Sequence, residues 1–258
     1  MYVESDDIRQ TFVISKNEIR KFIRGKRFLI YVILAAMVFS LITFLPYAFD
    51  EPWESTTFFL LAHNSFIYLM IILGVTLFAS TTYVSEFEDR TALIVFTRPV
   101  KKTSIYLGKF IGCFIMEAIV MVGYFAAMAT ATLFFDSVPS ISQYLTSLGC
   151  VMLFLFASSA LAAIFSVTMK KSGTAAILTF FTMFLFISII TAVIARATGD
   201  TPWYMLDYAS SAVFAVIPDV ADMLGLTDFD MTKAVATMMG WGIVSMIISW
   251  FLFTRKEM

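Results

Sequence analysis

The sequence predicts an all-α integral membrane protein with six transmembrane helices. Of its 258 residues, 60% are hydrophobic and only 14% are charged, whereas a soluble domain carries about 25% charged residues. Mean hydropathy is +0.86. The apolar residues fall in runs of about 20 or more, the length that a helix needs to cross a hydrocarbon core of about 30 Å.

Six apolar runs define the expected spans. They cover residues 28–45, 58–84, 105–135, 144–169, 174–195 and 234–253. The first is expected to stop before Pro46, because proline lacks the amide hydrogen that a helix interior uses. The third is long, roughly 46 Å as a helix, so it must tilt or project beyond the bilayer. Residues 1–27 are polar, so no cleavable signal sequence is expected and the first run is interpreted as an uncleaved span.

The placement of Lys and Arg predicts that both termini lie in the cytoplasm. With the N-terminus inside, 16 of the 18 Lys and Arg residues lie on the cytoplasmic side, and only Arg196 and Lys233 lie outside. The outer connections carry acids instead: Asp50, Glu51, Glu54, Asp136, Asp200, Asp207, Asp219, Asp222, Asp228 and Asp230. A net charge of -1 therefore combines a basic inner side with an acidic outer side.

The segment before the first span, residues 1–27, is expected to form an amphipathic helix at the inner membrane interface. Ser15 and Glu18 have the spacing of a helix-capping box. Phe22 lies among apolar residues on one helical face, and bases that include Arg20 and Arg24 lie elsewhere around the helix, suited to anionic headgroups. The alternative is a solvated basic leader that only follows the positive-inside rule.

The outer connection 196–233 is long for its position. Its apolar stretch 208–217 has ten residues, too few to cross a membrane. It forms either a re-entrant helix, which needs protein cover or a wet cavity, or a small extracellular cap.

Between the second and third expected spans, residues 86–103 form a densely charged segment on the cytoplasmic side. Its charged residues are Glu86, Glu88, Asp89, Arg90, Arg98, Lys101 and Lys102. The leading acids suit a helix N-terminus, an apolar run containing Leu93 and Phe96 follows, and Pro99 ends the helix. A helix with an apolar middle in the cytosol is expected to dock in a groove, either of a partner or of the chain's own inner ends.

Four features in and after this segment occur in a fixed order. They are an acid-rich opening (Glu86, Glu88), a Thr-x-Leu step (Thr91, Leu93), a proline followed by bases (Pro99, Lys101, Lys102) and a Gly-Lys pair that opens the third span (Gly108, Lys109). With them, the sequence resembles the membrane subunit of an ABC-2 type ABC transporter. The N-terminal stretch 16–30 resembles the opening of that family as well. One departure is Arg90, where members commonly have glycine.

The resemblance implies a division of labour. Residues 86–103 would be a coupling helix that docks on a separate cytoplasmic ABC ATPase subunit, which would bind ATP and Mg²⁺ while this chain binds no cofactor. The N-terminal helix would touch the same partner. The chain would act as the permease of an exporter in the plasma membrane, paired with a second copy or a paralogue. The residues assigned to ATPase coupling are Glu86, Glu88, Asp89, Arg90, Thr91, Leu93, Phe96, Arg98, Pro99, Lys101 and Lys102.

The sequence does not indicate ATP binding, a metal site or nucleic-acid binding in this chain. A phosphate-binding loop reads G-x-x-x-x-G-K-[ST], and the pair Gly108-Lys109 lacks the upstream glycine. The chain is therefore not expected to be an enzyme. A single histidine, His63, excludes a histidine-rich metal site, and Cys113 and Cys150 lie in apolar runs where packing is their expected role. Nothing indicates nucleic-acid binding.

Glu117 stands out as an acid deep within a span. A charge at that depth costs roughly 2.5–3.5 kcal/mol on insertion scales, so it should face the bundle interior or a cavity. It either contacts a substrate or cation in the translocation path, or it is protonated and hydrogen-bonded as packing. An ion-coupled secondary transporter or channel that uses Glu117 is the alternative function, although such proteins usually carry more than one intramembrane ionisable group. The small residues of Gly108-x-x-x-Gly112 favour close helix packing, within the chain or across a dimer.

Overall fold

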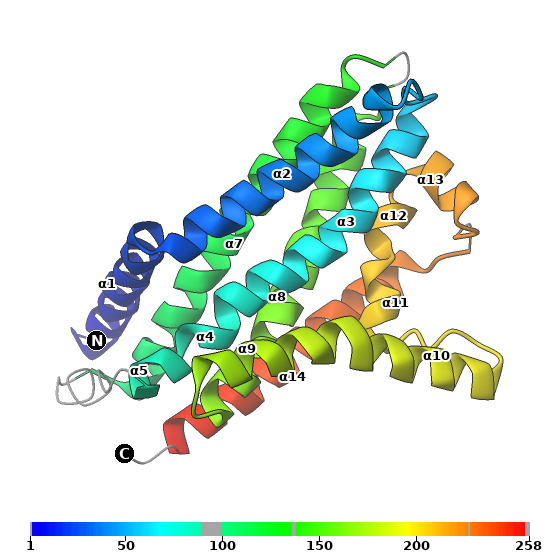
Figure 1. The fold of residues 1–258 in the computed structure, drawn as a ribbon. Helices are drawn as coiled ribbons and strands as arrows, with labels where there is room; N and C mark the ends of the chain where they lie inside the picture. Colours follow the sequence, from blue (N-terminus) through cyan, green and yellow to red (C-terminus); the bar gives the residue numbers. More distant parts are fainter. Residues whose placement is uncertain (1, 89–99, 136–137, 227, 256–258) are drawn as a thin grey trace.

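The computed structural model describes residues 2–88, 100–135, 138–226 and 228–255, with side chains from residue 7 onward. Throughout these ranges the architecture is helical (Figure 1). Six helices are long and apolar enough to cross a membrane. The predicted six-span all-α fold class is therefore confirmed.

The helices of the described ranges follow one another with short connections. In chain order they are α1 (Tyr2–Arg24), α2 (Lys26–Ala48), α3 (Thr56–Leu77), α4 (Ala79–Thr82), α5 (Val84–Glu88), α7 (Lys102–Thr132), α8 (Ile141–Thr168), α9 (Ser172–Phe181), a π-helical segment (Thr182–Phe186), α10 (Ile187–Thr198), α11 (Leu206–Ser210), α12 (Ala212–Ala215), α13 (Pro218–Met223) and α14 (Met231–Arg255). The second span consists of α3 and α4, and the fifth runs from α9 through α10.

The first span continues past Pro46, so the expectation that it stops before this proline was wrong. Pro46 lies within the last turn of α2, which ends at Ala48. At this position the missing amide costs one hydrogen bond near the helix end. The Pro46 carbonyl accepts from the amides of Phe49 (3.1 Å) and Glu51 (3.0 Å), which closes the helix.

The helix of the second span is interrupted at Phe78, and a second interruption at Tyr83 separates α4 from α5. The second interruption frees backbone amides that need an acceptor. Ser166 Oγ of α8 accepts from the amides of Tyr83 (3.0 Å) and Val84 (3.3 Å). A side chain of α8 thus sets the direction in which α5 departs toward the charged segment.

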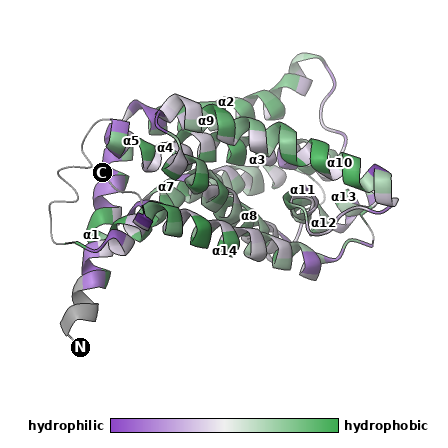
Figure 2. Cartoon of the chain, turned by 90° about the horizontal axis from the view of Figure 1, so that it is seen from below, coloured by the Kyte–Doolittle hydropathy of each residue, from purple (hydrophilic) through white to green (hydrophobic). Residues whose placement is uncertain are grey.

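The core lies between α3, α7 and α8, while α2 covers it from outside (Figure 1). Of the most apolar part of each span, 61% is buried in α8 but only 11% in α2. α14 packs closely on α8, where Gly242 leaves room for the ring of Phe156; a Cβ there would lie 2.4 Å from it. Hydrophobic residues cover the outer helices, and hydrophilic ones gather on α1 and at the ends of the spans (Figure 2).

The connection 196–233, predicted to lie outside, folds back on the bundle. The stretch 208–217 contributes to α11 and α12, whose residues Ala209, Ala212 and Val213 are buried. Side chains of the spans satisfy its carbonyls: Ser147 donates to Val213 O at 3.2 Å. Thr237 and Trp241 of α14 donate in the same way to the residues just before α11. Irregular backbone is thereby paired by α8 and α14, as such backbone requires beside a membrane.

Candidate functional site

The charged segment begins and ends at the base of the bundle, where α1, α5 and α7 meet. α1 packs directly along α7 because two glycines of α7 carry no side chain there. A Cβ at Gly108 would lie 2.7 Å from Thr11 O, and a Cβ at Gly112 would lie 2.9 Å from Glu18 Cβ. Within the chain, therefore, the Gly-x-x-x-Gly pattern accommodates α1.

Four charged residues meet in this contact, and we call them the Lys109 cluster: Glu18, Lys21, Glu86 and Lys109. Lys109 is 4% exposed. Its Nζ lies 3.0 Å from Glu18 Oε2 and 2.8 Å from Glu86 Oε1. Lys21, half-exposed at the rim, lies 3.2 Å from Glu86. Two acids and two bases balance in charge, and they join α1, α5 and α7.

Glu88, at the end of α5, connects the segment to the fifth span. Its carboxylate accepts from the backbone amide of Ser172 at 2.9 Å and from the Ser172 hydroxyl at 2.5 Å, in the first turn of α9. These two hydrogen bonds lower the pKa of Glu88 below its ordinary value. A carboxylate at a helix N-terminus is also favoured by the helix dipole.

The other end of the segment has its own contacts. Lys101 forms an ion pair with Asp7 of α1 at 2.5 Å. Lys102 donates to the carbonyl of Thr254, in the last turn of α14, at 3.0 Å. Both ends of the segment are thus attached to neighbouring helices.

Four of the eleven residues assigned to ATPase coupling are therefore placed by the structure, namely Glu86, Glu88, Lys101 and Lys102. The other seven lie outside the described residues: Asp89, Arg90, Thr91, Leu93, Phe96, Arg98 and Pro99.

The residues predicted for the interfacial helix divide into two pairs. Glu18 and Phe22 are buried against the bundle, and the Phe22 ring meets Phe78 edge to face at 5.0 Å. Arg20 and Arg24 are exposed. The predicted capping box of Ser15 and Glu18 is wrong, because α1 begins at Tyr2 and both residues lie in its interior. Glu18 binds Lys109 instead, a partner 91 positions away that local spacing does not reveal.

Glu117 lies between α7 and α8 and is 0% exposed. Ser159 Oγ donates to its Oε2 at 2.8 Å. Its Oε1 has no hydrogen-bond partner in the part of the chain that the structure describes. The geometry matches hydrogen-bonded packing, and contact with a translocated substrate stays a prediction.

His63 has a role that the sequence did not indicate. It is buried, with Nδ1 2.9 Å from the Tyr124 hydroxyl and Nε2 3.4 Å from Thr43 Oγ1. These contacts connect α3 with α7 and α2. Among the described residues, no three His, Cys, Asp or Glu side chains gather to hold a metal ion.

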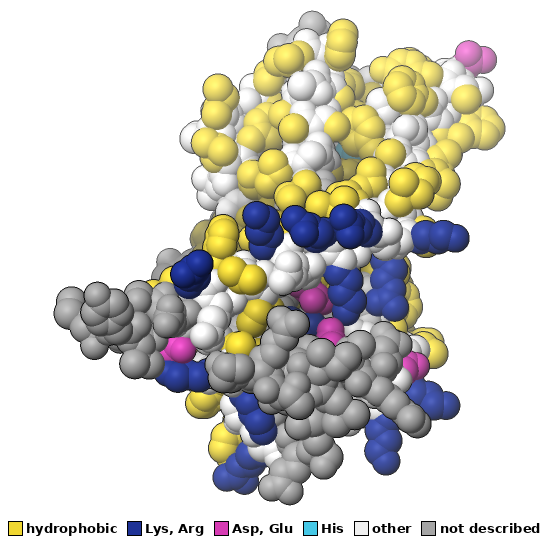
Figure 3. Space-filling model, turned by 90° about the vertical axis from the view of Figure 1, so that its left-hand side faces the viewer, with side chains coloured by type: hydrophobic (Ala, Val, Ile, Leu, Met, Phe, Trp, Pro, Cys, Tyr) yellow, Lys and Arg dark blue, Asp and Glu magenta, His cyan; other side chains and the backbone are white. Residues whose placement is uncertain are grey.

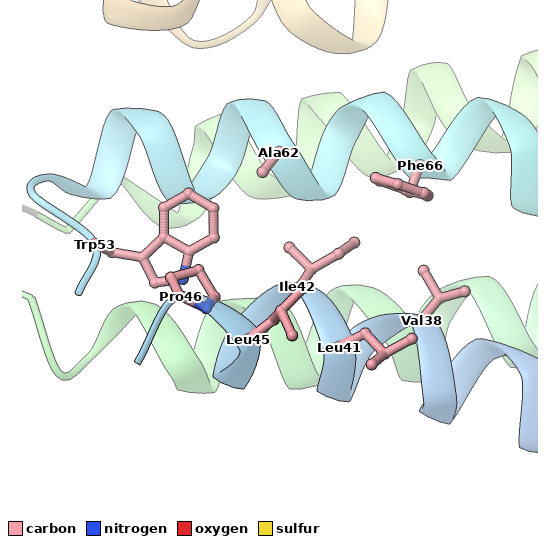
Figure 4. A pocket seen from close by; sticks show the side chains of 8 residues that line it. All are labelled: Val38, Leu41, Ile42, Leu45, Pro46, Trp53, Ala62 and Phe66. Carbon is pink, nitrogen blue, oxygen red and sulfur yellow. The ribbon is translucent and has the colours of Figure 1, made fainter. Parts of the chain in front are cut away.

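Two apolar hollows open beside α2, away from the Lys109 cluster. One of about 390 Å³ lies between α2 and α3, lined by Val38, Ile42 and Leu45 on one side and by Ala62 and Phe66 on the other (Figure 4). The second, of about 380 Å³, lies between α2 and α7. Their linings suit hydrocarbon and include neither Glu117 nor any member of the Lys109 cluster.

Residues 47–254 match the family described as ABC-2 family transporter protein. The matched range begins at the C-terminal end of α2 and covers every later span, the charged segment included. α1 lies before it. No curated protein matches the chain.

Proposed function

The chain belongs to the ABC-2 family of transporter proteins, and we propose that it is the permease of an exporter driven by a separate cytoplasmic ATPase subunit. It is a multi-pass protein of the plasma membrane and a permease subunit of an ABC transporter. We further propose that both its termini lie in the cytoplasm and that it pairs with a second copy or a paralogue. In this proposal, residues 86–103 are the segment that the ATPase subunit binds. ATP and Mg²⁺ bind on the ATPase subunit.

The Lys109 cluster is the observation that carries this proposal. A segment that receives force from a partner must pass it on without yielding, and buried ion pairs with good geometry resist separation because a lone buried charge is costly. Glu86 stands where the segment begins and Lys109 stands where the following span enters the bundle. Their 2.8 Å contact joins the start of the segment to the span that follows it.

The contacts around the segment then distribute a displacement over several spans. Glu86 connects it to α1 and α7, Glu88 to α9, and Lys102 to α14. Movement of the segment by the ATPase therefore acts on the third, fifth and sixth spans together, which is what reorientation of a translocation path requires.

Copurification tests the proposal. The tagged chain, coexpressed with ABC ATPases of its own host, should bring down one of them and stimulate its ATP hydrolysis. Phe96→Ala should weaken that association, because an apolar anchor is lost from the segment. Phe134→Ala, at a side chain 92% exposed beyond the far end of α7, is the matched control and should bind as the wild type does. Copurification without any ATPase, or equal loss in both variants, would contradict the proposal.

A second candidate is an ion-coupled transporter or channel that uses Glu117. It is favoured by the unpartnered Oε1 of this enclosed carboxyl group. The purified chain alone in liposomes should then move an ion or substrate down an imposed gradient, and Glu117→Gln should abolish the movement. If transport requires an ATPase and survives Glu117→Gln unchanged, this candidate is wrong.

A further inference from the structure

The surface of α1 is divided lengthwise into three sectors. One sector packs against the bundle through Ser15, Glu18 and Phe22. At 3.6 residues per turn, Ile8, Phe12 and Ile23 fall within roughly 60° beside it. They are 73%, 72% and 58% exposed, so they form an apolar ridge that no part of the described chain covers.

A basic flank follows the ridge. It consists of four exposed residues: Arg9, Lys16, Arg20 and Arg24. They span roughly the next 80° of the helix circumference and lie on the side opposite Glu18. The described acids of α1 are elsewhere, since Glu18 faces Lys109 and Asp7 faces Lys101. Among the described side chains of α1, no acid faces the basic flank, and these four bases add positive charge to this side of the helix.

The position of α1 relative to the spans indicates where the ridge and the basic flank lie relative to the membrane. α1 ends at Arg24, and Gly25 alone separates it from the first span. Figure 3 shows Lys and Arg side chains in a row directly below the apolar surface of the spans. In a bilayer that surrounds this apolar surface, bases in such a row would lie where hydrocarbon gives way to headgroups. The basic flank belongs to the helix directly before the first span, and the apolar ridge lies beside the flank on that helix.

We propose that the ridge and the basic flank of α1 bind the inner membrane surface and gather anionic phospholipids there. The ridge inserts among the acyl chains near the headgroups, as amphipathic interfacial helices do. The flank binds the phosphate groups of acidic lipids. Each base near an anionic leaflet strengthens the binding of the helix to that leaflet by on the order of five-fold. The attraction acts within a Debye length of about 8 Å at physiological salt.

This inference depends on the membrane spans and not on the ATPase partner. Its bearing on transport does rest on the proposed function. Glu18, on the inward sector of the same helix, binds Lys109, so a lipid-held α1 fixes one side of the cluster through which the segment acts.

A quenching experiment on the full chain tests lipid selectivity. Phe12→Cys is labelled with an environment-sensitive fluorophore, while Cys113 and Cys150 are buried and serve as the unlabelled background. The protein is placed in nanodiscs of one fixed mixture of phosphatidylglycerol and phosphatidylcholine. Bromine is carried by the acyl chains either of the anionic lipid or of an equal amount of the zwitterionic lipid.

Quenching should be stronger with the brominated anionic lipid, by roughly two-fold or more. The ratio should fall toward one in Lys16→Gln/Arg20→Gln, and also at high salt. The matched control, Lys170→Gln/Lys171→Gln, removes two exposed bases from the turn before α9 and should keep the wild-type ratio.

Three results would overturn the inference. No quenching by either lipid would show that α1 lies away from the bilayer and presents this face to a protein. A wild-type ratio of one would show that the bases only orient the chain. An equal fall in both double variants would show that total charge, and not the flank, sets the ratio. A failed ATPase copurification leaves all these readouts unchanged, so the two proposals fail separately.

Discussion

Removing Lys109 isolates the contribution of the buried cluster. Lys109→Met keeps much of the side-chain volume and removes the charge that faces Glu18 and Glu86. The side chains of Lys109 and Glu18 are 6% and 7% exposed and that of Glu86 is 16% exposed, so the two carboxylates cannot simply hydrate. The variant places two like charges in one poorly hydrated contact.

Breaking a buried ion pair by removing one partner costs about 3–5 kcal/mol. Two features place the cost of Lys109→Met at the lower end of that range. Lys21 lies 3.2 Å from Glu86 and 3.7 Å from Glu18 and retains part of the attraction, and Glu86 keeps some contact with water. We therefore expect Lys109→Met to destabilise the packing of α1 on α7 by about 3 kcal/mol.

A double-mutant cycle separates the ion pair from the packing. Glu18→Leu leaves Lys109 with Glu86 as its partner, and Lys109→Met/Glu18→Leu replaces a charged pair by two apolar side chains, a change that is often neutral. The assay is the midpoint of thermal unfolding in detergent for all four proteins, together with the protection of a cysteine placed on the inward face of α1. The double variant should be more stable than Lys109→Met alone. Purely additive effects, or a Lys109→Met midpoint equal to that of the wild type, would refute the reasoning.

Three further predictions concern single contacts. Gly112→Leu should detach α1, at a cost of about 1–3 kcal/mol from overpacking, whereas Gly123→Leu, where nothing lies within 4 Å of a Cβ, should leave the thermal midpoint unchanged. Ser159→Ala should lower the unfolding midpoint by the equivalent of about 1–3 kcal/mol, since it removes the side-chain donor to the buried Glu117 carboxyl group. The added change Glu117→Leu should restore much of the loss, and no restoration would count against this pairing. Because the folded pKa of Glu88 is lowered, its contact with α9 contributes stability above the ordinary carboxyl pKa and loses it as pH falls through the folded pKa. The distance distribution between spin labels on α5 and α9 should broaden over that acidic window, and a wild type and Glu88→Gln with the same pH profile would contradict this.

The spans were predictable because their signal is local. An apolar run of about 20 residues has one stable solution in a bilayer, a helix with all its backbone groups paired internally. The predicted ends of the spans agree less well with the helix ends in the structure. Pro46 is tolerated near a helix end. The helix is interrupted at Phe78 and again at Tyr83, and at Tyr83 the hydroxyl of Ser166 in α8 accepts the freed amides.

The contacts of the site were less predictable because they join distant positions. The density of charge in residues 86–103 drew attention to Glu86, but its pairing with Lys109 and Lys21 depends on how α1 crosses α7. Glu18 has an acceptable local partner in Ser15, and only the three-dimensional packing reveals the stronger one. His63 shows the same limit, since its partners come from two other spans.

The Ser166 hydroxyl has a mechanical consequence. One oxygen of α8 holds two successive amides at the junction of α4 and α5, so those peptide planes keep a set orientation toward α8. Rotation of α5 about this oxygen can keep both hydrogen bonds, whereas sliding of α5 along α8 would break them. A force applied to α5 would therefore rotate it about Ser166, a fixed point in the fourth span.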